Sequence, residues 1–215
     1  MSKQMQLLVE VPIACFRQSR AREYAETYPV PPPSTVYGML LSLVGEMDRY
    51  KHCGVKLAIA MLSQPAKSTV IRTFRRFKKK EIADPTNARP DYQELLTDIR
   101  FLLCVDSELE NEQTTLTDRL QSAFNYPEAI ARFGGLCLGE SRDLVNSIKP
   151  IKNLDGVEDF QACQWLCQDE NGLLTLPYWV DHVGSQGTRW KRYNLQQPSK
   201  VYEPPIISWT EIRTT

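Results

Sequence analysis

The chain has 215 residues, of which 42% are hydrophobic and 24% charged, and its 26 basic residues balance its 26 acidic ones. A chain of this length buries enough surface to fold without disulfide or metal staples, and zero net charge excludes a polycation that binds nucleic acid along its whole length. Any nucleic-acid site must therefore be a local patch. No run is apolar enough to cross a membrane and the N-terminus lacks a secretory signal, so we expect a cytoplasmic protein with no membrane partner.

The N-terminal part predicts a strand followed by a basic loop. Apolar residues alternate between Leu7 and Ile13, a pattern typical of a strand. The polar segment from Cys15 to Glu26 then carries three arginines: Arg17, Arg20 and Arg22. Two interpretations are open, a solvated loop or a cationic segment lying beside the helix that follows.

A run of prolines defines the start of the first predicted helix. Pro31 to Pro33 block a helix before this point, and Ser34 follows as the expected N-cap. Apolar residues then recur at helical spacing: Val36, Met39, Leu40, Leu43, Val44 and Met47. Such a helix start is expected to present free N–H groups and a positive dipole end, which suit a phosphate. The alternative is a plain core helix, and the arginines just before it favour the phosphate site.

The most basic stretch of the chain follows a second strand, expected over residues 55–62, and runs from Ser68 to Asp91. It interleaves basic and aromatic residues, among them Arg72, Phe74, Arg75, Arg76 and Lys78. Basic side chains neutralise phosphates, and aromatic rings stack on unpaired bases, each stack contributing about 1–3 kcal/mol. We predict a long hairpin or finger that projects from the body and contacts nucleic acid. The alternative is a solvated charged hairpin.

The chain is then expected to return through a buried strand over residues 99–105, a helix capped by Thr114 or Thr115, and a short helical turn opening at Pro127. A glycine-rich segment, residues 132–142, follows and contains adjacent Gly134 and Gly135. It lacks the spacing of a P-loop or of a dinucleotide-binding loop. These glycines indicate either a ligand passing close to the backbone or a plain turn that enters a strand at residues 144–148.

The predicted order is strand, helix, strand, finger, strand, helix, glycine loop, strand. This is the βαββαβ plan of an α+β, ferredoxin-like domain, used by many RNA-binding domains. We assign residues 1–149 to this RRM-like domain, with the finger at 68–91, and residues 150–215 to a small β-rich appendage. In the appendage, residues 160–167 and 172–179 are expected to be strands. Residues 188–193 alternate basic and aromatic types and give a second candidate RNA edge with Arg189 and Lys191.

Several motifs together resemble the Cas-five family of CRISPR-associated proteins. They are Pro-Pro-Pro-Ser-Thr-Val-Tyr-Gly at residues 31–38 and Arg-Phe-Gly-Gly-Leu-Cys-Leu-Gly-Glu-Ser at residues 132–141. The DevS-like branch of type I systems is closer still, through Val-Pro-Ile-Ala-Cys at residues 11–15, Asn-Ala-Arg-Pro at 87–90 and Leu-Leu-Thr-Asp at 95–98. The resemblance extends from the first strand to about Ile148, and residues beyond it match only loosely.

This resemblance implies a subunit at one end of Cascade, the RNA-guided DNA surveillance complex. Such a subunit grips the 5′ handle of the guide RNA, contacts the backbone subunit and the large subunit, and places a thumb near target DNA at the start of the guide–target duplex. Whether the complex recruits a nuclease or a transposition module stays open. The candidate RNA-binding residues are Arg17, Arg20, Arg22, Ser34, Tyr37, Arg72, Phe74, Arg75, Arg76, Lys78, Gly134, Gly135, Arg142, Arg189 and Lys191.

Catalysis is the rival interpretation, because some relatives in another CRISPR subtype cut repeat RNA without a metal. A general acid and base are needed, and the chain has only two histidines, His52 and His182. His182 with Tyr178 and Lys191 could form a metal-independent endoribonuclease site. Neither a carboxylate cluster nor a zinc-like cysteine pattern occurs in the sequence, so we expect no metal and no cofactor. We favour a subunit that is not an enzyme; a protein scaffold binding an acidic partner is the third possibility.

Overall fold

The computed structural model describes residues 3–21, 24–75, 80–151, 163–184, 186–197 and 203–214, without the side chains of Phe74 and Arg75. The strands are β1 (Gln4–Ala14), β2 (Tyr24–Ala25), β3 (Lys56–Met61), β4 (Ala66–Arg75), β5 (Ala88–Asp106), β6 (Ser147–Pro150), β7 (Gln164–Gln168), β8 (Leu174–Trp179), β9 (Arg189–Gln196) and β10 (Thr210–Glu211). The helices are α1 (Pro33–Leu43) and α2 (Leu116–Asn125), with single 3-10 turns at Pro85–Asn87, Pro127–Ala129 and Ile206–Ser208.

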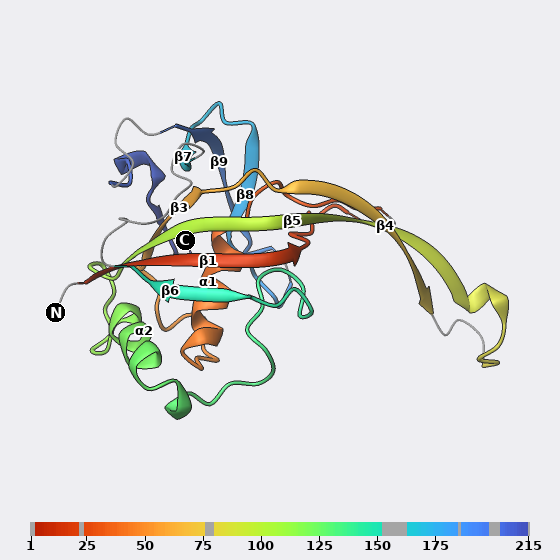
Figure 1. The fold of residues 1–215 in the computed structure, drawn as a ribbon, viewed down its shortest axis with the longest axis horizontal. Coiled ribbons are helices and arrows are strands. Elements are labelled where there is room, and N and C mark those ends of the chain that lie inside the picture. The colour runs from red at the N-terminus through yellow and green to blue at the C-terminus, as the bar shows by residue number, and fades with distance from the viewer. Residues whose placement is uncertain are drawn as a thin grey trace.

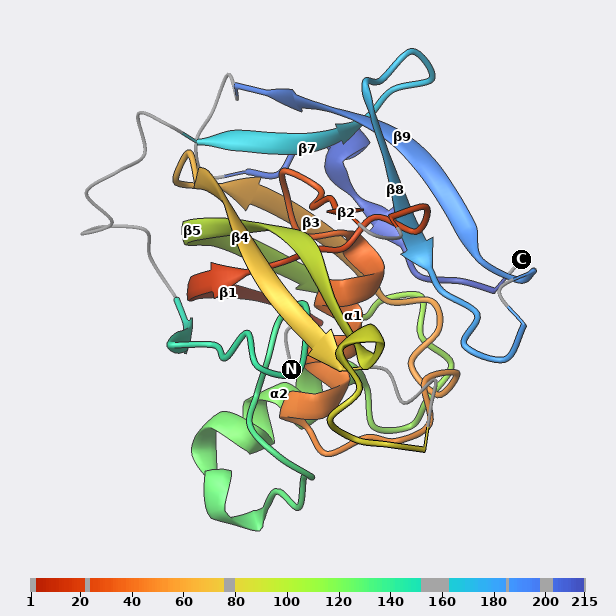
Figure 2. The same cartoon turned by 90° about the vertical axis from the view of Figure 1, so that its right-hand side faces the viewer.

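These strands form a single sheet in the order β6-β1-β5-β3-β7-β9-β8, and each neighbouring pair on this path is antiparallel. Both helices lie on one side of its central strands (Figures 1 and 2). The sequence predicted a fold of mixed helices and strands, and this is confirmed; that the described strands join one large, mainly antiparallel sheet was not predicted. No helix in the described part of the chain is both long and apolar enough to cross a membrane.

The central strands are buried on both faces, which explains their nearly continuous apolar sequences. Alternate residues of β5, Ile99, Phe101, Leu103 and Val105, belong to the core that also contains the buried residues of α1 and α2. The intervening Leu102 and Cys104 pack on the opposite face in a second cluster around Trp165 of β7. The sheet thus fixes the ends of β1, β3 and β5, from which the loops described below emerge.

The predicted finger is an arm formed by β4 and β5, and it projects far from the body (Figure 1). The two strands pair antiparallel from Ala66↔Thr97 to Arg75↔Ala88. The buried strand predicted at residues 99–105 is confirmed as the inner half of β5, which runs without interruption from the arm into the centre of the sheet. Arm and body therefore share one strand.

The strands beyond residue 150 continue the same sheet, because β7 pairs with β3. The strands predicted at 160–167 and 172–179 are β7 and β8 in their described parts, but they do not pair with each other, since β9 lies between them. Residues 152–162 lie outside the described chain. The division into two domains at residue 150 stays a prediction.

Two local predictions about the helices had different outcomes. Thr115 caps α2 in a capping box, with its side chain accepting from the Asp118 N–H, as expected. The assignment of Ser34 as the N-cap of α1 was wrong. The helix begins two residues earlier than expected, because the fixed φ of Pro33 suits the first helical position, and Pro32 is the N-cap. The strand predicted at 144–148 begins later, as β6.

Candidate nucleic-acid interface

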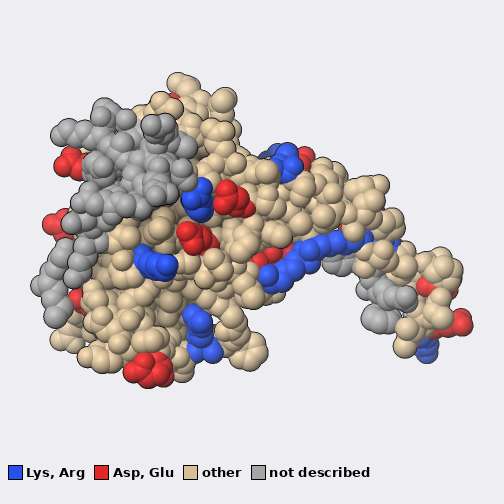
Figure 3. All heavy atoms as spheres, viewed as in Figure 1, with Lys and Arg blue, Asp and Glu red and all other residues tan. Residues whose placement is uncertain are grey.

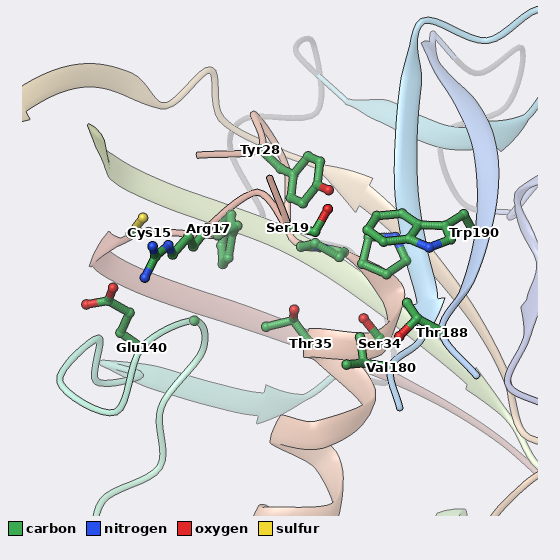
Figure 4. A pocket seen from close by; sticks show the side chains of 14 residues that line it. Cys15, Arg17, Ser19, Tyr28, Ser34, Thr35, Glu140, Val180, Thr188 and Trp190 are labelled. Atoms are coloured by element: carbon green, nitrogen blue, oxygen red, sulfur yellow. The ribbon is translucent and has the colours of Figure 1, made fainter. Parts of the chain in front are cut away.

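A pocket of about 690 Å³ opens where four separate segments of the chain meet. We call it the cradle. The loop after β1 contributes Arg17 and Tyr28, the start of α1 contributes Ser34, the glycine-rich loop contributes Glu140, and the end of the β8–β9 hairpin contributes Trp190. Figure 4 shows Arg17 and Glu140 at one end of the cradle and Trp190 at the other. The sequence analysis considered that the arginine loop could lie beside the start of the helix, and the structure brings these two segments together with the glycine-rich loop.

The glycine-rich loop is held against the end of β1 by a single buried carboxylate, that of Asp143. Its Oδ2 accepts the N–H of Cys15 and the N–H of Glu140, each at 2.9 Å. The main-chain oxygen of Asp143 accepts the Leu138 N–H at 2.9 Å, which closes the loop on itself. This arrangement places Glu140 at the mouth of the cradle.

The glycine that matters for this close approach is Gly139, whereas the sequence analysis emphasised Gly134 and Gly135. Gly139 has a φ of +112°, and a Cβ there would lie 2.9 Å from the main-chain oxygen of Cys15. A Cβ on Gly134 meets nothing within 4 Å, and one on Gly135 meets only a Leu144 side-chain carbon, at 2.8 Å. Neither Gly134 nor Gly135 lines the cradle.

The loop after β1 folds back on itself and displays its arginines outward. The Phe16 main chain bonds to Thr27 and to the Tyr28 N–H, the latter at 2.8 Å. Arg17 and Arg20 are both exposed. Arg20 lines an adjoining pocket of about 590 Å³, which shares Tyr28 and Trp190 with the cradle. Arg22 lies outside the described residues, and its role stays a prediction.

A buried carboxylate also connects this loop to the base of the arm. Glu94 of β5 accepts the Thr27 N–H at 3.0 Å and pairs with Lys67 of β4 at 2.9 Å. Burial alone raises the pKa of Glu94, but the bonds from Lys67 and Thr27 outweigh it and the pKa lies below its ordinary value. The loop and the arm are therefore held in a fixed relation.

The start of α1 offers fewer donors than the sequence analysis expected. Pro32 and Pro33 have no N–H, and the N–H groups of Thr35 and Val36 both bond to the Pro32 oxygen, at 2.9 and 3.1 Å. Among the described residues this leaves the N–H of Ser34 without a partner at the helix start. The prediction of several free N–H groups for a phosphate was wrong, because the prolines remove them.

Two of the predicted arginines meet at the junction of arm and glycine-rich loop. Arg72 of β4 lies 3.7 Å from the Glu140 carboxylate, and Arg142 also pairs with Glu140. Arg142 further donates to the Gln93 side chain at 2.6 Å. One carboxylate thus holds two guanidinium groups near the mouth of the cradle, partly neutralising both.

The strand pairing of the arm separates residues that the sequence placed in one basic run. Arg72 is opposite Asp91, whereas its neighbour Ile71 is opposite Tyr92 and so lies on the other face. Basic atoms follow one edge of the arm (Figure 3). The side chains of Phe74 and Arg75, and all of Arg76 and Lys78, lie outside the described structure, so their RNA contacts stay predictions. The face with Ile71 also carries the stacked rings of Tyr24 and Tyr92, 6.1 Å apart.

The second basic and aromatic edge contributes to the cradle through a residue that the sequence analysis did not select, Trp190. Side chains alternate along β9, so Arg189 and Lys191 are directed away from the face that carries Trp190. Lys191 donates to Gln168 at 2.9 Å and lies over the Tyr178 ring, and burial lowers its pKa. The alternation of basic and aromatic residues along β9 could be read from the sequence. Which of the two sets faces the cradle depends on how β9 pairs with its neighbouring strands.

Tyr37 is a core residue of α1 in this structure. Its side chain is 1% exposed, and its hydroxyl donates to the main-chain oxygen of Arg49 at 2.8 Å. A buried ring has no face on which a base can stack, so we leave Tyr37 out of the candidate interface.

The residues considered for catalysis do not form a clear acid–base pair. Burial, followed by the charge of Arg49, lowers the pKa of His182, and Lys191 is bonded to Gln168 as described above. His52 is buried with Nδ1 2.7 Å from a Glu110 carboxylate oxygen, which gives it a structural partner. Within the described ranges, no group of three or more His, Cys, Asp or Glu side chains could hold a metal ion.

Comparisons with known proteins agree with one another. Residues 5–158 match the family described as "CRISPR-associated protein (Cas_Cas5)". The chain is 42% identical over 194 residues to "CRISPR-associated protein Cas5" of Myxococcus xanthus (strain DK1622), covering 89% of each sequence. In structure it is similar to a chain of a "CRISPR RNA-guided surveillance complex", with a TM-score of 0.61, 17% identity and 90% of each chain covered. A "Crystal structure of Cas protein" matches with a TM-score of 0.52 and 16% identity, covering 94% of this chain and all of that one.

Proposed function

The chain belongs to the Cas5 family of CRISPR-associated proteins, and on that premise we propose that it is a non-catalytic subunit of a type I Cascade complex that binds the 5′ handle of the guide RNA. Family membership agrees with the resemblance predicted from the motifs around Ser34 and Gly135. The observation that carries the proposal is the cradle, which brings the Arg17 loop, the start of α1 and the glycine-rich loop together with an aromatic wall.

The ferredoxin-like plan of the RNA-binding part is supported by two observations. The chain order is β1, α1, β3, β5, α2, β6, with the arm inserted between β3 and β5. The corresponding strands lie side by side as β6-β1-β5-β3. Many RNA-binding domains use this plan.

The arm is proposed to be the thumb that lies near target DNA at the start of the guide–target duplex. Its length supports this role, because ten paired residues span about 30 Å. The proposed protein partners are the backbone subunit and the large subunit of Cascade. In such a complex base pairing reads the sequence, while the protein holds the backbone and the shape of the nucleic acid.

The first test replaces the exposed arginines of the loop after β1. Arg17→Ala with Arg20→Ala is expected to weaken binding of handle RNA roughly tenfold at moderate salt, because two phosphate contacts are lost. The slope of log affinity against log salt should fall by about 1.4 in magnitude. Fluorescence anisotropy with labelled repeat RNA measures both quantities. The matched control is Arg192→Ala, which removes an arginine bonded to main-chain oxygens of Glu170 and Gly172 away from the cradle. Equal affinity of the double variant and the wild type would contradict the cradle assignment.

The same assay decides between binding and cleavage. We expect the repeat RNA to remain intact with and without chelator. RNA cleavage that persists in chelator and disappears in His182→Ala would establish the endoribonuclease alternative instead.

The arm is tested separately through its basic residues. Arg75→Ala with Arg76→Ala should reduce the guide RNA recovered with co-expressed complex by several-fold, while the unfolding temperature of the isolated chain stays unchanged, the pattern expected of side chains that contact RNA and do not support the fold. The readout is the ratio of absorbance at 260 and 280 nm across a gel-filtration peak. An unchanged guide content would show that these arginines are not RNA contacts.

A further inference from the structure

The cradle has two chemically different ends, and together they match the two parts of a nucleotide. At one end lies the exposed guanidinium group of Arg17, beside Glu140. The negative charge of Glu140 is paired with Arg72 and Arg142. At the other end lie Trp190, Thr188 and Ser34 (Figure 4). A cation suits a phosphate, and an indole ring beside hydroxyl groups suits a base.

An unpartnered polar group points to a ligand at the second end. Ser34 is 9% exposed, and its Oγ has no hydrogen-bond partner among the described residues. The Ser34 N–H is also without a partner there, as shown above. A buried hydroxyl left without a partner costs about 1–3 kcal/mol and is uncommon in folded proteins. Since Ser34 lines the cradle, a ligand in the cradle can accept a hydrogen bond from the N–H, and can either accept from or donate to the hydroxyl.

The aromatic lining favours a base over a bare phosphate at this end. Trp190 is 38% exposed despite its size, and Tyr28 also lines the cradle. The proline run removes the N–H groups that would hold a phosphate at the helix start, as described above. A heterocycle with its own donors and acceptors can stack on an indole ring and bond to Ser34, whereas a phosphate cannot stack.

We propose that the cradle binds one nucleotide of the handle RNA turned out of the strand, with its base stacked on Trp190 and hydrogen-bonded to Ser34, and its phosphate near Arg17. This inference rests on the proposed handle binding and adds to it a site for a single base. The volume of about 690 Å³ falls in the range of pockets that bind small molecules and is ample for one nucleotide.

Ser34→Ala gives a test in which stability and binding change in opposite directions. Removing a buried hydroxyl that has no partner should leave the unfolding temperature of the full chain unchanged or raise it. Affinity for handle RNA should nevertheless fall roughly fivefold, because one hydrogen bond to the base is lost. A merely structural serine would show the reverse pattern, with lower stability and unchanged affinity, and that result would overturn the role of Ser34.

The base itself is located with handle RNA that carries 2-aminopurine at one position at a time, because stacking on indole quenches its fluorescence. We expect strong quenching at one position with the wild-type chain and its loss with Trp190→Ala. Trp190→Phe should retain part of the quenching. Trp190→Ala should weaken the binding of intact handle RNA roughly 5- to 100-fold. With an abasic residue at the same position of the RNA, the variant and the wild type should bind equally well. Tyr126→Ala is the matched control, since Tyr126 is an exposed aromatic residue at the end of α2 and does not line the cradle.

The outcomes separate this inference from the proposed function. If the chain binds handle RNA but no position depends on Trp190, the single-base site is overturned while handle binding stands. If the wild-type chain and the co-expressed complex both fail to bind handle RNA, both proposals are overturned. If the quenching at one position is lost in Trp190→Ala, and the abasic RNA removes the effect of that mutation on affinity, the single-base site is established.

Discussion

Asp143→Ala is expected to destabilise the protein by about 2–4 kcal/mol and to weaken handle RNA binding at least tenfold. The Asp143 carboxylate accepts hydrogen bonds from the N–H groups of Cys15 and Glu140, and Asp143 is only 4% exposed. Alanine leaves both N–H groups without this acceptor, and each such loss costs about 1–3 kcal/mol. The glycine-rich loop then separates from the end of β1, and the cradle loses the wall that carries Glu140.

Urea unfolding measures the stability change, and anisotropy with handle RNA measures the binding change at a temperature where the variant is folded. Asp143→Asn is the matched control, because its amide oxygen can still accept the two N–H groups, and we expect it to lose less than half as much stability. A change below about 0.5 kcal/mol for Asp143→Ala, the size of an ordinary surface substitution, would show that the loop is held by other contacts.

Tyr37→Ala is expected to cost about 3–5 kcal/mol of folding stability, the usual loss for removing a large buried aromatic ring. The Tyr37 ring packs 6.4 Å from that of Trp179, and its hydroxyl bonds to the main chain of Arg49. Burial raises the pKa of this hydroxyl, so it stays protonated and acts as a donor.

Tyr37→Phe separates a core role from an RNA role. It keeps the ring and removes one hydrogen bond, so we expect a loss of about 1 kcal/mol with unchanged affinity for handle RNA. Chemical denaturation and anisotropy on the same preparation give both values. A stable Tyr37→Phe variant with tenfold weaker RNA binding would return Tyr37 to the interface.

The sequence predicted those features that depend on local pattern. The proline run, the helical spacing after it and the capping residue Thr115 each act over a few neighbouring residues, so the starts of the helices could be located to within two residues. The end of α1 could not: it ends at Leu43, whereas the spacing predicted a helix as far as Met47. The arm was predictable for the same reason, because an uninterrupted charged run between two apolar strands has no place in a core. The meeting of the Arg17 loop with the start of α1 followed from their proximity in the chain.

The features that the sequence did not predict depend on partners far away in the chain. Trp190 enters the cradle because β9 pairs with β8 and β7 in a particular register, and no local signal distinguishes its face from that of Lys191. Asp143 looked like one more charged residue, and only its contact with Cys15, 128 positions away, reveals its role. Serine is a favoured N-cap residue, so Ser34 was expected to cap α1, but the preference of Pro33 for the first helical turn moves the start of the helix before it.

The sharing of β5 between the arm and the sheet has a consequence for how the chain folds during synthesis. The apolar strand β1 is made first, yet both of its neighbours in the sheet, β5 and β6, lie far downstream. Because β1 pairs with β5 as far as Asp106, the centre of the sheet cannot close until that residue has left the ribosome, about 5–20 s after β1 at typical rates of synthesis. The arm, by contrast, is a local hairpin and can pair as soon as its outer half emerges. Chains truncated before Asp106 should therefore carry a formed hairpin beside an unpaired, aggregation-prone β1.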